Sequence, residues 1–434
     1  MSWQVSLLLI SGVLFGLLMI GEWIVFSLGI AGMLFLLVVG GTSALAPIGS
    51  IVWESASNYT LTSIPLFILM GELILQSRIG ERFYFGMSMI FRRIPGGLLH
   101  TNIISCGIFA ALTGVSVATA ATIGTVAIPE LTKQGYDRKM IFGTLAAGGT
   151  LGILIPPSIP FILYGVLAQQ SVAKLFAAGI LPGIMMVALF VLYTGLRVFF
   201  NPNLAGRSSN TDQVRFSLST VCISVFPIIG LIALCVGGIY AGIMTPTEAA
   251  AVGAVLAMVL YLGYVGFDPL AMKAVISNTV RTSCMVLFIA VGAQIFSFAM
   301  VYSDLNQTLT GWVVSHGTTP GVVFVLIIGI YIVLGCFLDP ISIVVLSMGV
   351  LYPIVVQLNF DPIWFGVILV IMVELGLITP PVGLNLFVIH GISGRRPMGE
   401  IISGAFPYCI ILLFGVLLLY AFPNIALLLP NSMR

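Results

Sequence analysis

Two short segments of the chain carry backbone groups that could bind ions. Leu151–Pro157, which reads LGILIPP, returns 224 positions later as Leu375–Pro381, which reads LGLITPP. Each Pro-Pro pair lies inside a long apolar stretch, where a proline removes a backbone donor and clashes with the preceding turn. A broken helix exposes carbonyl groups at one end and amide groups at the other. The carbonyl end suits a small hard cation and the amide end an anion, so the pattern predicts two ion-binding breaks.

The alignment of the two repeats at a spacing of 224 extends upstream of the breaks without a gap, since Asp137 aligns with Asp361 and Pro129 with Pro353. In lipid, a break survives only where protein buries it or where it lines a polar cavity. A tolerated kink is the alternative for either break alone, and two breaks in register argue against it. We expect backbone ligation of Na⁺ at six positions, namely Gly152, Ile155, Pro157, Gly376, Thr379 and Pro381.

A cluster of small and hydroxyl residues precedes the first break. Thr113–Thr119 reads TGVSVAT, and its Thr113, Ser116 and Thr119 offer hydroxyl groups. Small residues allow the backbone to approach a ligand closely. The same composition also suits close helix packing in a membrane, which is the alternative interpretation.

Acidic residues inside membrane spans are candidates for function, and Glu72, Asp339 and Glu374 qualify. Asp339 has a second interpretation as the N-cap of a helix that begins at Pro340. Glu374 occupies the repeat position of Thr150 and could face the cavity, or it could be a buried neutral carboxyl group. We expect a structural role for Glu72.

The composition sets the environment in which these groups act. Of 434 residues, 59% are hydrophobic and only 7% are charged, against about 25% charged in an average soluble domain. This indicates a polytopic membrane protein. The net charge of +2 and the lack of a basic block exclude nucleic acid as a partner. No GxxxxGK[ST], HExxH or GxSxG motif occurs, and an intramembrane aspartyl protease would need two facing aspartates, so we expect no enzyme.

Apolar stretches of bilayer-spanning length, about 20 residues, divide the chain into two halves. We expect spans at 4–20, 23–41, 60–77 and 175–198 in the first half, and at 216–238, 246–265, 274–303 and 400–429 in the second. The breaks lie in two further spans, 138–168 and 363–390. Segments 95–131 and 320–357 are too long for one crossing and too short for two, so we predict re-entrant hairpins.

The positions of the basic residues favour this arrangement. With the N-terminus outside and both hairpins re-entrant, all Lys and Arg residues lie inside except Lys174, Arg434 and, within a span, Arg281. The inside segments include a loop between 60–77 and 95–131 that carries Arg78, Arg82, Arg92 and Arg93. Met1–Gln4 lacks the basic start of a signal peptide, so we expect a retained first span and both termini in the periplasm. The halves, 1–200 and 216–434, then have opposite orientations, joined by a cytoplasmic connection at 201–215. The sequence thus predicts an all-α inverted repeat.

Three segments together resemble one transporter family. Thr245–Ala251 reads TPTEAAA, Ile155–Pro160 reads IPPSIP and Gly376–Asn385 reads GLITPPVGLN. In these segments, and along most of its length, the chain is similar to the large membrane subunit of tripartite ATP-independent periplasmic (TRAP) transporters. We expect Thr245-Pro246-Thr247-Glu248 itself to be a capping box that starts a helix.

The resemblance implies an elevator-type ion-transporter fold in the inner membrane. It implies two partners, a small four-span membrane subunit and a periplasmic substrate-binding protein. No small subunit is fused at the N-terminus, so we expect a separate chain. The resemblance also implies at least two Na⁺ ions, each between a hairpin tip and a break. The first site would use Thr113, Ser116, Gly152, Ile155 and Pro157, and the second Gly376, Thr379, Pro381 and the tip around Asp339.

We expect a small organic acid anion, such as a C4-dicarboxylate or a sialic acid, between the two tips. Ser116, Thr119, Ser158 and Asn385 would contact it. Arg281 is the only basic residue that we expect to be buried in a span, so hydroxyl groups and helix N-termini would do most of the recognition. The alternative function is a stand-alone Na⁺/dicarboxylate-type carrier that needs no binding protein.

Overall fold

The computed structural model describes residues 2–92, 94–206, 218–315 and 319–433. Every regular element in these ranges is a helix. Seven helical stretches of the described chain are long and apolar enough to cross a membrane, and five shorter apolar helices accompany them. The predicted all-α architecture of a multi-pass membrane protein is confirmed.

The described residues of the first half form ten α-helices, interrupted by short 3-10 turns. They are α1 (Trp3–Met19), α2 (Ile24–Gly40), α3 (Ile48–Ala56), α4 (Ser63–Gln76), α5 (Ile79–Phe91), α6 (Gly97–Thr113), α7 (Ser116–Lys133), α8 (Arg138–Thr150), α9 (Ile159–Leu167) and α10 (Val172–Phe200). The second half contains α11 (Leu218–Tyr240), α12 (Pro246–Tyr264), α13 (Pro269–Tyr302), α14 (Leu305–Ser315), α15 (Pro320–Gly335), α16 (Pro340–Gln357), α17 (Pro362–Ile378), α18 (Leu384–Ile392), α19 (Met398–Ala421) and α20 (Asn424–Ser432).

The predicted hairpins and broken helices are present in both halves. The pairs α6–α7 and α15–α16 form the two hairpins, and α8–α9 and α17–α18 form the two broken helices. Matching helices begin 224 positions apart, at Ser116 and Pro340 and again at Arg138 and Pro362. Both Pro-Pro peptide bonds are cis. The halves differ in detail. A 3-10 turn at Tyr59–Thr62 divides α3 from α4 where α13 runs unbroken, and a 3-10 turn at Leu151–Ile153 follows α8 where α17 continues to Ile378.

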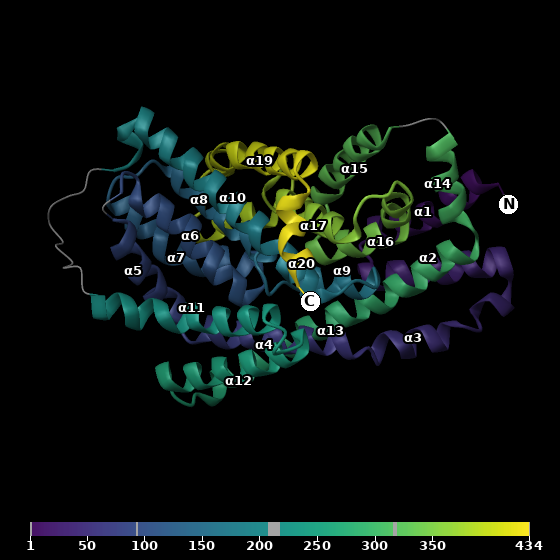
Figure 1. The fold of residues 1–434 in the computed structure, drawn as a ribbon, viewed down its shortest axis with the longest axis horizontal. Coiled ribbons are helices and arrows are strands. Elements are labelled where there is room, and N and C mark those ends of the chain that lie inside the picture. Colours follow the sequence, from purple (N-terminus) through teal and green to yellow (C-terminus); the bar gives the residue numbers. More distant parts are fainter. Residues whose placement is uncertain (1, 93, 207–217, 316–318, 434) are drawn as a thin grey trace.

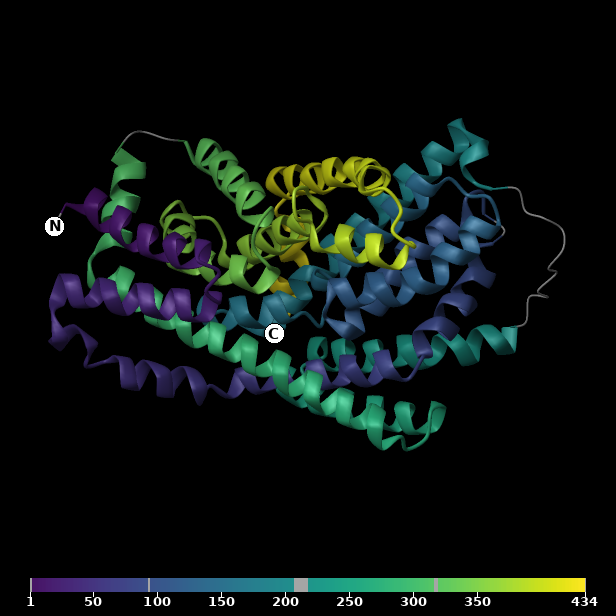
Figure 2. The same ribbon diagram turned by 180° about the vertical axis from the view of Figure 1, so that it is seen from behind.

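The packing of the helices follows the same repeat. Helix α2 packs on α13 while α12 packs on α4, and α8 packs on α19 while α17 packs on α10. In the repeat, α2 matches α12, α4 matches α13, α8 matches α17 and α10 matches α19. Each of these contacts therefore occurs twice with the halves exchanged, as expected when a two-fold axis relates the halves. Figure 1 shows α3, α4, α11, α12 and α13 along one side of the molecule, with the hairpins, broken helices and α19 on the other. Figure 2 shows the same two groups from behind.

Side-chain caps begin the helices that carry the breaks. Asp137 accepts a hydrogen bond from the Met140 amide at 3.0 Å, and its repeat mate Asp361 accepts from Trp364 at 3.0 Å. Such caps satisfy amides that have no partner within the helix. The capping box is also confirmed, since the Glu248 amide donates to Thr245 Oγ1 at 3.3 Å and the Thr245 amide to Glu248 Oε2 at 2.8 Å.

Some predicted boundaries are wrong. The expected span 400–429 is two helices, because Pro423 follows the end of α19 and cannot continue its hydrogen-bond ladder. Helix α5 occupies what we expected to be an arginine-bearing loop, and Arg82 lies over the Tyr264 ring at 4.9 Å. Helices α3 and α14 were not expected.

The division of the chain into 1–200, 201–215 and 216–434 stays a prediction. Residues 201–206 of the connection contain the 3-10 turn Pro202–Leu204. Residues 207–215 lie outside the described part of the chain, as does Arg93 of the expected basic loop.

Candidate ion and anion sites

The tip of the first hairpin is a tight turn with hydroxyl groups on its inner side. Helix α6 ends at Gly114, whose φ of +61° is in the left-handed region that glycine tolerates. Thr113 Oγ1 and Thr119 Oγ1 lie 2.8 Å apart, and both side chains are buried. The turn therefore brings together two of the three predicted hydroxyl groups.

This tip lies against the first break. A Cβ atom on Gly114 would lie 3.8 Å from the carbonyl oxygen of Pro157, and one on Gly152 would lie 2.5 Å from Ala110 Cβ on α6. In the described chain, no hydrogen bond reaches the carbonyl groups of Gly152, Ile155 or Pro157. The Ser158 hydroxyl donates within the break, to the Ile153 carbonyl at 2.5 Å. The three predicted backbone ligands of the first site thus have unpaired carbonyl oxygens, and that of Pro157 lies close to the hairpin tip.

The second hairpin tip lies against the second break in the same way. Cys336 Sγ donates to the Pro380 carbonyl at 3.2 Å. A Cβ atom on Gly376 would lie 2.6 Å from Gly335 Cα, so α15 and α17 touch backbone to backbone. The Thr379 and Pro381 carbonyls accept no hydrogen bond from the described residues, whereas the Gly376 carbonyl accepts one from the Thr379 amide at 3.4 Å.

Asp339 caps helix α16. Its carboxylate accepts hydrogen bonds from the amides of Ile341 at 3.1 Å and Ser342 at 3.3 Å, and from the Ser342 hydroxyl. The N-cap interpretation of this aspartate is therefore confirmed. The structure shows no hydrogen bond from Asp339 to the second break, so its role as an ion ligand stays a prediction.

The two halves of the repeat meet at a polar pair. Asn385 Nδ2 on α18 donates to Ser116 Oγ at 2.8 Å, and Ser116 Oγ is 3.1 Å from Asn385 Oδ1. A Cβ atom on Gly149 would lie 3.3 Å from Asn385 Nδ2, so α8 forms a third wall. Two of the predicted anion-binding residues are thereby in direct contact, and Thr119 lies one helical turn along α7 from Ser116. Ser158 has no hydrogen bond to either member of the pair.

The sequence profile described as "Tripartite ATP-independent periplasmic transporter, DctM component" matches residues 11–425. The chain belongs to this family. It is 34% identical to the C4-dicarboxylate TRAP transporter large permease protein DctM of Pseudomonas aeruginosa, covering 93% of this chain and 94% of that one. It is 30% identical to the sialic acid TRAP transporter large permease protein SiaM of Vibrio cholerae, covering 96% of each.

A solved structure shares the fold of this TRAP permease. The YdaH transporter of Alcanivorax borkumensis superposes with a TM-score of 0.63 at 14% identity, over 90% of both chains. Both named relatives and this solved structure are described as transporters.

One sequence expectation for the permease is wrong. Arg281 lies within α13 as predicted, but its side chain is exposed on the surface of the helix rather than buried. It therefore supplies no buried positive charge for an anion. Glu72 is partly buried on α4 and accepts a hydrogen bond from Asn278 Nδ2 at 3.2 Å, in agreement with a structural role.

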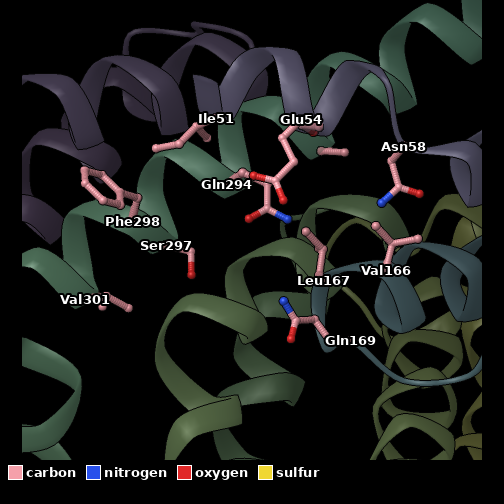
Figure 3. A pocket seen from close by; sticks show the side chains of 12 residues that line it. Ile51, Glu54, Asn58, Val166, Leu167, Gln169, Gln294, Ser297, Phe298 and Val301 are labelled. Atoms are coloured by element: carbon pink, nitrogen blue, oxygen red, sulfur yellow. The ribbon is translucent and has the colours of Figure 1, made fainter. Parts of the chain in front are cut away.

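A polar cavity of the permease was not anticipated from the sequence. It has a volume of about 350 Å³ and lies between α3, α13 and the end of α9. Figure 3 shows Glu54, Gln169 and Gln294 around it. None of the predicted site residues lines this cavity. Its lining residues lie far apart in the sequence, so no local motif marks them.

Proposed function

We propose that this permease is the large membrane subunit of a Na⁺-coupled importer of small organic acid anions. C4-dicarboxylates and sialic acids are the first candidates, because the named relatives carry them. The observation that carries the proposal is the Ser116–Asn385 pair, which joins the first hairpin tip to the second broken helix. The second break, with the unpaired carbonyls of Thr379 and Pro381, lies in the same broken helix as Asn385, and the Pro157 carbonyl of the first break lies close to the same tip.

The charges of the substrate explain why two ion sites are useful. Importing a dicarboxylate against about 100 mV, inside negative, costs roughly 4.6 kcal/mol for its two charges. Each Na⁺ that enters with it offsets about 2.3 kcal/mol of this, and a tenfold Na⁺ gradient adds about 1.4 kcal/mol per ion. Two Na⁺ ions therefore remove the electrical penalty, and the two breaks supply two sites.

Recognition of the anion rests on neutral groups in this proposal. Arg281 is exposed on α13, while Ser116, Thr119, Ser158 and Asn385 are all buried. Hydroxyl and amide groups in a dry site form strong hydrogen bonds to a carboxylate, because little water competes for it. We assign the anion to the region around Ser116 and Asn385, where it would take the place of their mutual hydrogen bonds.

The repeat also suggests how the anion moves. The hairpins and broken helices would travel as one body against α2, α4, α12 and α13, which is an elevator mechanism. If the N-terminus is in the periplasm, as the basic residues predict, the cavity beside Glu54 and Gln294 would lie toward the outer face of the inner membrane. A periplasmic binding protein would deliver the anion at this face, and a four-span membrane subunit would complete the complex.

Uptake by reconstituted proteoliposomes tests the proposal. The permease with its four-span subunit is reconstituted, the binding protein is added outside, and uptake of labelled succinate and N-acetylneuraminate is measured in Na⁺ and in K⁺. We expect uptake of one of these acids only with Na⁺ outside and the binding protein present. Undiminished uptake without Na⁺ would refute ion coupling, and full uptake without the binding protein would favour the stand-alone carrier.

A further inference from the structure

The cavity between α3, α13 and the end of α9 carries polar groups that the proposed ion and anion sites do not use. Its volume of about 350 Å³ falls within the range of small-molecule sites, about 300–1,000 Å³. Figure 3 shows Glu54 and Gln294 pointing into it from one side and Gln169 facing them from the other. The side chains of these three residues form no hydrogen bond or salt bridge with the rest of the described chain. The cavity therefore offers polar groups whose bonding capacity is unused.

The polar lining combines one carboxylate with several amide and hydroxyl groups. The residues are Glu54, Ser55, Asn58, Gln169, Gln294 and Ser297, and none of the described residues that line the cavity is basic. A carboxylate only accepts hydrogen bonds, whereas an amide both donates and accepts them. Asn58 Oδ1 already accepts from the Thr60 amide at 3.0 Å, so its NH₂ group is the part that remains to donate.

This set of groups matches a ligand with several neighbouring hydroxyl groups. Hydroxyls donate to the Glu54 carboxylate, and a planar carboxylate or amide pairs with two of them at once. Phe298 adds an aromatic wall against which the apolar face of a sugar ring can pack. Succinate matches the lining poorly, because it has no hydroxyl to donate and both of its carboxylates are repelled by Glu54.

The backbone at Gln169 is a second, independent indication that its side chain has a use. Gln169 follows the end of α9 with a φ of +54°, in the left-handed region that disfavours residues other than glycine. At the end of the matching helix α18 the left-handed residue is Gly394, with a φ of +73°. The first half thus keeps an amide side chain, aimed into the cavity, where glycine would fit the backbone better.

We propose that this cavity is an entry site for a hydroxylated sugar acid, and that acids of this class are the cargo of the permease rather than plain C4-dicarboxylates. Glu54 accepts hydrogen bonds from the hydroxyls of the sugar acid. Its carboxylate lies across the cavity beside the Gln169 amide, away from Glu54. This inference rests on the proposed import of an organic acid and narrows its substrate.

The entry site is separate from the central anion site. Helix α9 begins directly after Ser158 and its nine residues end two positions before Gln169, so the two sites lie about 14 Å apart along its axis. Glu54 and Gln294 lie on α3 and α13, whereas Val166 and Gln169 belong to the first broken helix and its end. A ligand here therefore touches both the stationary helices and the proposed moving body before it reaches Ser116 and Asn385.

Protection of a cysteine from labelling tests whether the cavity binds such acids. Ser297→Cys is placed in a permease whose exposed Cys222 and Cys284 are replaced by alanine. The complex with the four-span subunit is reconstituted, and a membrane-impermeant maleimide is added outside without the binding protein. We expect N-acetylneuraminate or D-glucuronate to slow labelling at least fivefold and succinate to leave it unchanged. Ser50→Cys, exposed on α3 and outside the cavity lining, is the matched control and should show no protection by any acid.

Two further variants in the Ser297→Cys background test the assigned roles. Glu54→Gln removes the charge, so the preference for the hydroxylated acid over succinate should fall about tenfold. Glu81→Gln on α5 is its control and should keep the preference. Gln169→Gly should raise the acid concentration for half-protection about tenfold without lowering the thermal unfolding temperature, because glycine tolerates the left-handed backbone. A lower unfolding temperature with unchanged protection would overturn the role of Gln169 in binding.

The outcomes separate this inference from the proposed function. Equal protection by succinate, or no protection by either hydroxylated acid, would overturn the entry site, while Na⁺-dependent uptake of succinate would leave the proposed function standing. Protection without Na⁺-dependent uptake of any acid would support the binding site and overturn the proposed function. If Ser297→Cys does not fold, Ile51→Cys on α3 reports on the same cavity and the same results are expected.

Discussion

The contact between Gly335 and Gly376 offers a sharp test of how the second hairpin tip and the second break work together. A Cβ atom on Gly376 would lie 2.6 Å from Gly335 Cα, whereas ordinary van der Waals contact begins at 3.4 Å. Both partners are backbone, so no side chain can rotate away. Gly376→Ala must therefore move α15 and α17 apart by about 0.8 Å or more, at a cost of about 1–3 kcal/mol.

This displacement should appear in the Na⁺ dependence of transport. If the strain separates the tip from the break, the apparent Na⁺ affinity falls by about 5- to 150-fold, which corresponds to 1–3 kcal/mol. The assay is initial uptake by proteoliposomes at increasing external Na⁺, normalised to the amount of folded permease. The matched control is Gly329→Ala on α15, the helix that Gly376 faces, where an added Cβ atom meets nothing within 4 Å. Gly329→Ala should behave as wild type.

One result would refute the reasoning. If Gly376→Ala is folded and shows the wild-type half-saturating Na⁺ concentration, then the approach of α15 to α17 does not position an ion site. If Gly376→Ala gives less folded permease, but the folded fraction keeps the wild-type Na⁺ dependence of uptake, then Gly376 serves only in packing.

Three further substitutions distinguish binding from stability. Ser116→Ala should lower uptake at subsaturating anion about tenfold while costing only about 1 kcal/mol in unfolding free energy; an equal loss of folded protein would show a packing role instead. Thr245→Ala removes the capping box and should cost about 1 kcal/mol in thermal unfolding of the complex, with transport per folded molecule unchanged. Tyr408→Phe removes the 2.8 Å hydrogen bond to Thr194 between α19 and α10, and should likewise lower stability by about 1 kcal/mol without changing the Na⁺ or anion dependence.

Much of the architecture was predictable because proline acts locally. The Pro-Pro pairs interrupt α8–α9 and α17–α18 where the sequence places them, whereas single prolines such as Pro182 and Pro227 lie inside continuous helices. The hairpins were predictable from length, because 95–131 and 320–357 do not fit one or two full crossings. Helix α5 was missed because its arginines suggested a loop, although its apolar face packs on α6 and α11.

The side-chain contacts were less accessible from the sequence. Hydropathy places Arg281 inside an apolar helix but does not say which face of that helix is buried, so its exposure was predicted wrongly. The capping of α16 by Asp339 was predictable, since the partners of a cap are its immediate neighbours. The cavity beside Gln294 joins three distant segments, and only the tertiary fold brings them together.

The most direct test of the account is an experimental map of the permease with its four-span subunit, prepared in high Na⁺ with the transported acid. We predict ion density at the carbonyls of Gly152, Ile155 and Pro157 and at those of Thr379 and Pro381, with the anion beside Ser116 and Asn385. If Pro157 and Pro381 instead pack as bends against lipid, with no ion at either break and the anion elsewhere, the central claim is wrong.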